Sequence, residues 1–224
     1  MSLVAIGATW LGVGVLLASA ASLGGILAAS LYASSHIDVA KNASLSYNFV
    51  SANGNLNGKT LATGQVWVVH SGSWSIQANR GRQTNTGNLR TASLPWFRTP
   101  TVVGATITTT GPFNLGVYMQ GNAAGTVATV LRVRNGTPNV VELGRISGGT
   151  FTVRASTTSA TSAATWALSY KDGDCTVTRN GTSILTYTFP AIERAAIEAN
   201  TRVGMITSGN VGNDRYTGFT ASSF

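Results

Sequence analysis

Short segments of alternating apolar and polar residues, separated by turn dipeptides, dominate the chain from residue 45 onward. Strict alternation places successive side chains on opposite faces of a strand. The dipeptides between the segments are typical of tight hairpins: Asn135-Gly136, Gly148-Gly149, Asp172-Gly173 and Asn180-Gly181. In this part of the chain we expect strands at 66–70, 73–78, 102–109, 114–119, 127–134, 139–145, 150–155, 165–171, 174–179, 183–189 and 202–207, with no helical run longer than 191–199. This pattern predicts an all-β sandwich or barrel over 45–224, with an irregular lead-in between Leu45 and Val66.

Composition narrows the function classes. Charged residues make up 10% of the 224 residues, where a soluble domain usually carries about 25%. A hydrophobic fraction of 43% is enough to bury a core and excludes disorder. The single Cys175 excludes a disulfide scaffold and a Cys-based zinc site, and its alternation with Val177 predicts a buried thiol. Two histidines and seven carboxylates leave little equipment for acid–base catalysis.

The charged residues all follow residue 37, and Asp38 is the first of them. The formal net charge is +8 and the isoelectric point is about 10.3. The basic residues are scattered singly, and no run is similar to a nuclear localisation signal or a polybasic arm. We therefore expect no nucleic-acid partner. Sparse charge that keeps a β surface soluble is one interpretation, and attraction to an anionic envelope polymer is the other.

Residues 1–37 are apolar or small throughout. A helix over 2–33 would be roughly 48 Å long, more than the ~30 Å hydrocarbon core of a bilayer. Its larger residues follow a coiled-coil heptad, with seam positions Leu3, Ile6, Trp10, Val13, Leu17, Ala20, Leu27 and Leu31. The other faces are apolar too, so every side of the helix must be covered. The pattern predicts one apolar N-terminal α-helix ahead of the β domain.

Three roles stay open for this helix. If the helix forms the core of an assembly, we expect a homo-oligomer of three or more copies, because a single partner in a two-stranded coil would cover only the seam. As a membrane segment over 3–33 it has the necessary length, and Gly14-xxx-Ala18-xxx-Ser22 is a small-residue interface. As a secretory signal peptide it lacks a positive n-region, since no Lys or Arg precedes Lys41.

Several spaced motifs carry a family resemblance over 49–224. At the start they are the G-x-x-W of Gly64–Trp67 and the G-x-W-x-I of Gly72–Ile76, and later ones lie at 166–170, 172–173, 177–181, 202–205 and 216–222. This set resembles concanavalin A-like (laminin-G-like) lectin and glucanase jelly-roll domains. Arg215 and Thr217 stand where that family often has an acidic residue.

The resemblance extends to domains in minor tail or tail-tip proteins of phages that infect actinobacteria. It implies a virion structural protein, of the tail tip or a fibre, whose jelly roll attaches to host cell-envelope glycan. The N-terminal helix would then assemble it with further copies and with other virion proteins. The alternatives are a membrane-anchored, lectin-like protein on the extracellular face, and a glycan hydrolase.

The residues argue against an enzyme. Glucanases of the resembled family use a Glu-x-Asp-x-x-Glu strand, which agrees with the need for two facing carboxylates. Here Glu142 stands alone, and Glu193 and Glu198 lie in the expected short helix. His70 and Ser71 are neighbours in a strand, so they point to opposite faces and cannot pair. We expect no catalytic residues.

Two oxygen-rich loops are candidate calcium sites. Asp172 and Asp174 flank a turn, and Asn210, Asn213 and Asp214 form a second loop. Calcium takes 6–8 oxygen ligands, partly from backbone carbonyls. The hairpin by itself explains Asp172-Gly173. We therefore expect no cofactor, with calcium as the alternative.

A glycan site needs an exposed aromatic ring beside polar loop side chains. Trp96 lies between Pro95 and Pro100 and is expected in a loop, next to Arg98. Tyr216, beside Asn213 and Asp214, is the second candidate platform. Apolar alternation places the other domain tryptophans, Trp67, Trp74 and Trp166, in the core.

Overall fold

The computed structural model describes residues 44–50, 52–84, 87–96, 102–109, 114–160, 163–209 and 215–222. The chain divides into two units, Met1–Asn42 and Ala43–Phe224. The predicted N-terminal helix and all its seam residues lie outside the described residues. Across the ranges given above, no helix has the length and apolar character needed to cross a membrane. The helix seen there is α4 (Ala191–Glu198), far from the N-terminus.

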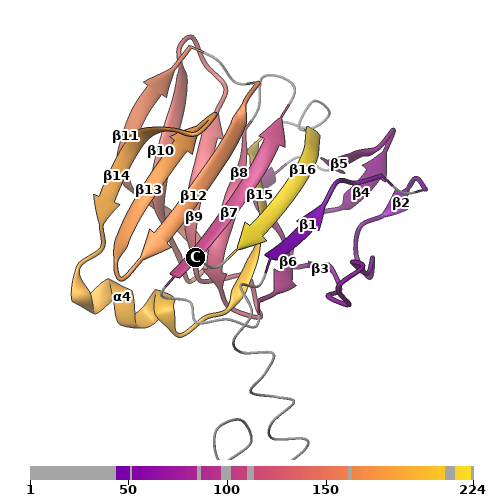
Figure 1. The fold of residues 1–224 in the computed structure, drawn as a ribbon, viewed down its shortest axis with the longest axis horizontal. Coiled ribbons are helices and arrows are strands. Elements are labelled where there is room, and N and C mark those ends of the chain that lie inside the picture. Colours follow the sequence, from indigo (N-terminus) through magenta and orange to yellow (C-terminus); the bar gives the residue numbers. More distant parts are fainter. Residues whose placement is uncertain are drawn as a thin grey trace, which may run out of the picture. The chain divides into compact units, whose positions relative to one another are not determined.

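The described part of the second unit is mostly β, in two antiparallel sheets that face each other across one core (Figure 1). The nine-stranded sheet has the order β14 (Thr182–Thr188), β13 (Asp174–Arg179), β12 (Thr165–Lys171), β7 (Val102–Thr109), β16 (Arg215–Ser222), β5 (Arg80–Gln83), β4 (Trp74–Gln77) and β2 (Gly54–Asn55), with β1 (Ser44–Tyr47) also paired to β16. The all-β prediction is confirmed.

The seven-stranded sheet has the order β11 (Thr150–Ser159), β10 (Asn139–Ser147), β9 (Ala128–Arg134), β8 (Leu115–Gly121), β15 (Arg202–Gly209), β6 (Gly87–Pro95) and β3 (Val68–Val69). The chain changes sheet eight times: between β2 and β3, β3 and β4, β5 and β6, β6 and β7, β7 and β8, β11 and β12, β14 and β15, and β15 and β16. This exchange of strands between two antiparallel sheets is consistent with a jelly-roll sandwich.

The core between the sheets is rich in aromatic rings. Trp67, Trp74 and Trp166 are buried in it, which confirms their predicted positions. Trp67 meets Phe219 edge to face, with ring centroids 5.4 Å apart. Burial of each such side chain stabilises the fold by about 1.5–3 kcal/mol, so these rings contribute much of what holds the two sheets together.

The hairpins follow the predicted turn chemistry. In the turns after β10, β12 and β13 both central residues have positive φ: 58° and 79° at Gly148-Gly149, 50° and 102° at Asp172-Gly173, and 49° and 82° at Asn180-Gly181. That is the combination a two-residue primed turn requires. The β9–β10 connection differs, because Asn135–Pro138 make a four-residue loop.

The structure adds β1, β2, β5, β6 and β16 to the predicted strands. The predicted irregular lead-in therefore contains paired backbone. β5 has the sequence Arg-Gly-Arg-Gln, which carries no apolar residue, and β6 buries Thr91 and Ser93 as well as Ala92 and Leu94. Neither strand shows an apolar alternation, so the pattern could not reveal it.

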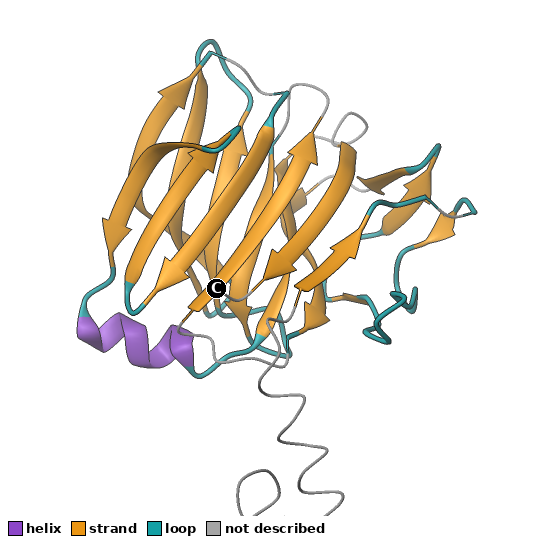
Figure 2. Cartoon of the chain, viewed as in Figure 1, coloured by secondary structure: helices purple, strands orange, loops and turns teal. Residues whose placement is uncertain are grey.

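Helix α4 confirms the predicted short helix, and it is the purple element of Figure 2. It links β14 of one sheet to β15 of the other. Its Ile197 enters the core, and its Glu193 is hydrogen-bonded to Arg154 of β11. The helix is thus tied to both the core and the seven-stranded sheet.

Candidate functional site

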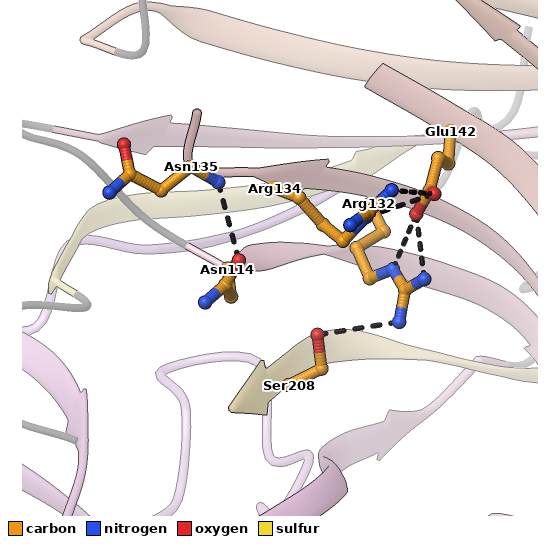
Figure 3. Close-up of polar contacts among 6 residues, drawn as sticks. All are labelled: Asn114, Arg132, Arg134, Asn135, Glu142 and Ser208. Atoms are coloured by element: carbon orange, nitrogen blue, oxygen red, sulfur yellow. Dashed lines mark hydrogen bonds and ion pairs between the residues drawn. The ribbon is translucent and has the colours of Figure 1, made fainter. Parts of the chain in front are cut away.

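Glu142 on β10 faces away from the core, because its neighbours Val141 and Leu143 belong to the core. Arg132 places Nε and Nη2 2.8 and 2.7 Å from Glu142 Oε2. Arg134 places Nε and Nη2 2.9 and 2.8 Å from Oε1 (Figure 3). Both carboxylate oxygens are therefore occupied by guanidinium N–H groups. Glu142 is a structural ion pair rather than a group presented to a ligand.

The arginines of this cluster have further contacts. Arg132 Nη1 lies 3.4 Å from Ser208 Oγ, and its guanidinium carbon is 4.3 Å from the centre of the Phe151 ring. Asn114 Oδ1 accepts from the backbone N–H of Asn135 nearby (Figure 3). These contacts hold the outer surface of β8, β9, β10 and β15 in place.

The other glutamates are also held. Glu193 accepts from Arg154, and Glu198 accepts from the Tyr170 hydroxyl and from Arg194 Nε. Burial and the bond to Glu198 raise the pKa of Tyr170. Glycosidases need two carboxyl groups facing one bond. Each glutamate within the described ranges is instead bonded to arginine.

His70 contacts Ser93 rather than its neighbour Ser71. His70 Nε2 is 2.6 Å from Ser93 Oγ, and Arg202 Nε donates to the same oxygen at 2.9 Å. Ser93 is fully buried and accepts from a cation, so it is not an accessible nucleophile. Burial, and then the charge of Arg202, lower the pKa of His70 from its usual 6.5. Ser71 Oγ donates to Leu89 O, so the two neighbouring side chains have different partners.

Cys175 is buried as predicted. Burial, with a smaller contribution from the charge of Asp174, raises the pKa of the thiol. The protonated form of the thiol is therefore favoured, which disfavours a role as a nucleophile or a metal ligand.

The predicted glycan platforms are wrong. Trp96 is 3% exposed and Tyr216 is fully buried, so both rings belong to the core. The chain turns back after β6, where Trp96 N bonds Thr201 O at 2.7 Å. The Tyr216 hydroxyl donates to Ile206 O at 2.6 Å, which anchors it between the sheets. Arg98, Asn213 and Asp214, predicted beside these rings, lie outside the described residues.

The predicted calcium-binding residues of the β12–β13 turn do not form a ligand cluster in the structure. Asp172 and Asp174 lie at the β12–β13 turn, and Asp174 Oδ1 accepts from Thr188 Oγ1 at 2.6 Å. In the ranges that the structure describes, no three His, Cys, Asp or Glu side chains gather where they could hold a metal. Two carboxylates of one turn, one already engaged, do not fit the 6–8 oxygens that calcium takes. The second predicted loop, at Asn210, Asn213 and Asp214, is outside the described residues.

A cavity of about 430 Å³ lies where the β2–β4 end of the nine-stranded sheet meets β3 of the other sheet. Figure 1 shows β2 and β4 at the right-hand edge of the view. Its volume falls in the range of small-molecule sites, roughly 300–1,000 Å³. It is lined by Asn55, Asn57, Val69, Gly72, Ser73, Trp74, Ser75 and Thr84.

The strand pattern explains why this lining is polar. Trp74 and Ile76 of β4 point into the core, so Ser73 and Ser75 project from the opposite face. Likewise Leu56 is buried while Asn55 and Asn57 are exposed. The alternation that builds the core therefore also collects hydroxyl and amide groups on the outer side of this edge.

Hydrogen bonds fix the two amides. Asn55 Oδ1 accepts from Asn57 N at 2.9 Å, and Asn57 Oδ1 accepts from Val69 N at 3.0 Å. Each carbonyl oxygen is thus used by the backbone, which leaves the Nδ2 group to donate to a ligand. Thr84 Oγ1 donates to Ser73 O at 3.1 Å. No lining residue titrates near neutral pH, so the cavity can bind through hydrogen bonds but cannot move a proton.

This cavity was not predicted from the sequence. A signal was present in the polar residues between Trp74 and Ile76 and in the asparagines around Leu56. This signal could not be recognised, because β2 is only two residues long and shows no periodic pattern. The hydrogen bond between Asn57, just after β2, and Val69 of β3 joins strands of opposite sheets, which spacing alone does not reveal.

Comparisons with known proteins give the fold. An endo-β-1,3-glucanase from Pyrococcus furiosus is similar at a TM-score of 0.52 and 10% identity, over 80% of this chain and 93% of that one. The lectin of Bauhinia forficata, solved with GalNAc, has a TM-score of 0.50 and 15% identity, over 82% and 99%. A carbohydrate-binding module of Bacillus subtilis has a TM-score of 0.50 and 9% identity, over 75% and 97%.

No family model matches the sequence, and no curated protein matches it either. At such low identities the structural likeness is consistent with a jelly-roll sandwich fold and shows nothing finer. Glycan binding, catalysis and assembly must be argued from the residues of this chain.

Proposed function

We propose that the sandwich domain binds glycan in the cavity between β2, β3 and β4, without cleaving it. The observation that carries the proposal is the lining: amides and hydroxyls of Asn55, Asn57, Ser73, Ser75 and Thr84, with no titratable side chain. Sugar hydroxyls both donate and accept hydrogen bonds, so they suit such a set. The solved structures of similar fold include a lectin, a carbohydrate-binding module and a glucanase, which supports the same ligand class.

Filling the cavity tests this proposal. Ser73 is an exposed lining residue, so Ser73→Phe should block the cavity without disturbing the core. Thr182→Phe is the matched control, because Thr182 is exposed on β14 at the opposite end of the same sheet. The full chain and both variants are titrated against immobilised polysaccharides. We expect Ser73→Phe to abolish binding and Thr182→Phe to retain it; unchanged binding by Ser73→Phe contradicts the site.

For the whole chain we propose a virion role: a phage tail-tip, minor tail or fibre component that attaches to host cell-envelope glycan. Residues 1–37 would join three or more copies and other virion proteins. The resemblance over 49–224 and the uncharged heptad at the N-terminus support this proposal. Purified particles should contain the chain, and the recombinant full-length protein should be oligomeric. A stable, soluble full-length monomer contradicts the assembly role.

Fractionation separates this role from the alternatives. Recovery in the soluble or particle fraction without detergent favours assembly, whereas retention in membranes at high salt favours an anchor over 3–33. The hydrolase alternative requires new reducing ends when the protein is incubated with a glycan that it binds. We expect none, since the described glutamates are all bonded to arginine.

A further inference from the structure

The cavity lies in a part of the chain that contains no carboxylate. Between Asp38 and Glu142 the sequence has neither Asp nor Glu. The same stretch holds eight basic residues: Lys41, Lys59, Arg80, Arg82, Arg90, Arg98, Arg132 and Arg134. All cavity-lining residues fall within it. The charge of the arginines on β5 is therefore not neutralised by any acidic residue of the strands that form the cavity.

Arg82 stands beside the cavity wall. Antiparallel pairing sets Asn55 opposite Ser75 and Ser75 opposite Arg82. Directly opposed residues share a face, with Cβ atoms about 4.5–5.5 Å apart. Asn55, Ser75 and Arg82 thus form a row across β2, β4 and β5 on the outer face. Arg82 Nη1 donates to Gln77 Oε1 at 2.9 Å, which holds the guanidinium over β4.

Two polar atoms of this row have no hydrogen-bond partner in the part of the chain that the structure describes. Ser75 Oγ and Arg82 Nε are buried, and neither has a hydrogen-bond partner within the described residues. A buried polar group without a partner destabilises the folded chain, and an occupant that supplies an acceptor recovers that free energy. Arg82 Nε can only donate, and the Ser75 hydroxyl can donate as well as accept, so a ligand acceptor suits both atoms.

We propose that the cavity takes a saccharide bearing an anionic group, such as a carboxylate or a sulfate, with that group next to Arg82. This inference rests on the proposed function and names its ligand class. The amides of Asn55 and Asn57 donate to sugar hydroxyls, while the Arg82 guanidinium pairs with the anionic group of the saccharide. A neutral sugar offers hydroxyl acceptors but leaves the charge of Arg82 without a counter-charge, whereas an anionic group supplies both acceptors and the opposite charge.

Matched ligands test the charge directly. The full-length protein is titrated with polygalacturonate and with its fully methyl-esterified form, which share a backbone and differ in charge. Dextran sulfate and dextran form the second pair, so the two pairs distinguish a carboxylate from a sulfate. We expect at least one charged member to bind about tenfold more tightly than its neutral partner, with the difference shrinking at high salt.

Matched variants locate the site. Arg82→Gln should reduce the affinity for the charged glycan about tenfold. Lys171→Gln is the control, because Lys171 is exposed at the end of β12 and loses the same charge. Thermal unfolding of both variants should match the parent chain.

Each remaining outcome overturns a defined claim. Equal binding of the charged and neutral members, or unchanged binding by Arg82→Gln, overturns this inference and leaves glycan binding standing. An equal loss in Lys171→Gln, or equally tight binding of duplex DNA, shows non-specific charge attraction and also overturns it. Failure of every glycan, charged or neutral, overturns the proposed function and this inference with it.

Discussion

Arg132 and Glu142 are direct partners across β9 and β10, and both Nε and Nη2 of the arginine meet the same carboxylate oxygen, at 2.8 and 2.7 Å. The second oxygen is taken by Arg134 in the same way. The Glu142 carboxylate is therefore part of the scaffold of the seven-stranded sheet.

Replacing Glu142 should destabilise the sandwich. Glu142→Gln leaves the largely buried Arg132 without a counter-charge, and we expect a loss of about 2–4 kcal/mol in the free energy of unfolding. Arg134→Gln, at a side chain that is 45% exposed, should cost about 1 kcal/mol or less. Urea denaturation of both variants measures the difference. Equal losses of stability in the two variants would contradict the role assigned to Arg132. Separately, if the protein cleaves a glycan and Glu142→Gln leaves that cleavage intact, our interpretation of Glu142 as a non-catalytic carboxylate is wrong.

His70 should make the domain less stable in mild acid. Its pKa is lowered in the folded state by burial and by Arg202. The unfolded chain therefore binds the proton more readily, and the stabilising contribution, complete above about pH 6.5, is lost as the pH falls toward the folded-state pKa. Unfolding free energies of the parent and of His70→Gln are compared between about pH 5 and pH 8. The variant should show the flatter profile, and identical slopes would refute the prediction.

The Tyr216 hydroxyl should contribute measurably to stability. It donates to Ile206 O and lies 3.2 Å from Gly116 O, in a fully buried position. Tyr216→Phe removes a donor and leaves a buried carbonyl unpaired, at a cost of about 1–3 kcal/mol. Tyr47→Phe, in a half-buried ring of the same core, is the control and should be nearly neutral. Chemical denaturation decides between them.

Gly204 should not tolerate a side chain. An added Cβ would lie 2.1 Å from Ala92 O and 2.8 Å from the Tyr118 ring. Gly204→Ala must therefore displace β15 from β6, and we expect a loss of about 1–3 kcal/mol. A Cβ at Gly218 meets nothing within 4 Å, so Gly218→Ala should stay within about 0.5 kcal/mol of the parent. Thermal unfolding ranks the two, and the reverse order would contradict the packing described here.

The helix predicted over residues 1–37 has its own test. Leu17→Asp places a charge in the predicted heptad seam and should abolish oligomerisation, while the far-ultraviolet circular dichroism of the β domain stays unchanged. Light scattering coupled to size exclusion measures the copy number. Normal assembly by Leu17→Asp would show that the helix is not the assembly element.

Local chemistry made much of the sandwich predictable. The Asp172-Gly173 and Asn180-Gly181 turns depend on positive φ at adjacent residues, which neighbouring side chains decide. The strands 102–109, 165–171 and 174–179 have the predicted bounds, because alternation across a half-buried face is visible in a few residues. The same alternation placed Trp67, Trp74 and Trp166 in the core.

The predicted site failed where burial depends on distant strands. The prolines around Trp96 indicated a loop and therefore exposure, but the chain at Trp96 bonds Thr201, more than a hundred residues later, and the ring packs into the core. Polar neighbours in the sequence led us to expect an exposed Tyr216, yet its hydroxyl donates to Ile206 O in the opposite sheet. Exposure is a property of what lies opposite, which spacing along one segment does not contain.

An all-β domain, its hairpins and its buried tryptophans could be inferred from residues close together in the chain, because turn chemistry and alternation act over a few positions; composition showed how few acid–base groups there are. The pairing of strands and the packing of the two sheets placed Asn55 of β2 and Val69 of β3 beside one cavity and set Ser75 opposite Arg82. Such contacts join residues whose order in the chain carries no periodic signal. They arise from the pairing register and the packing of the two sheets, and the candidate glycan site is made of them.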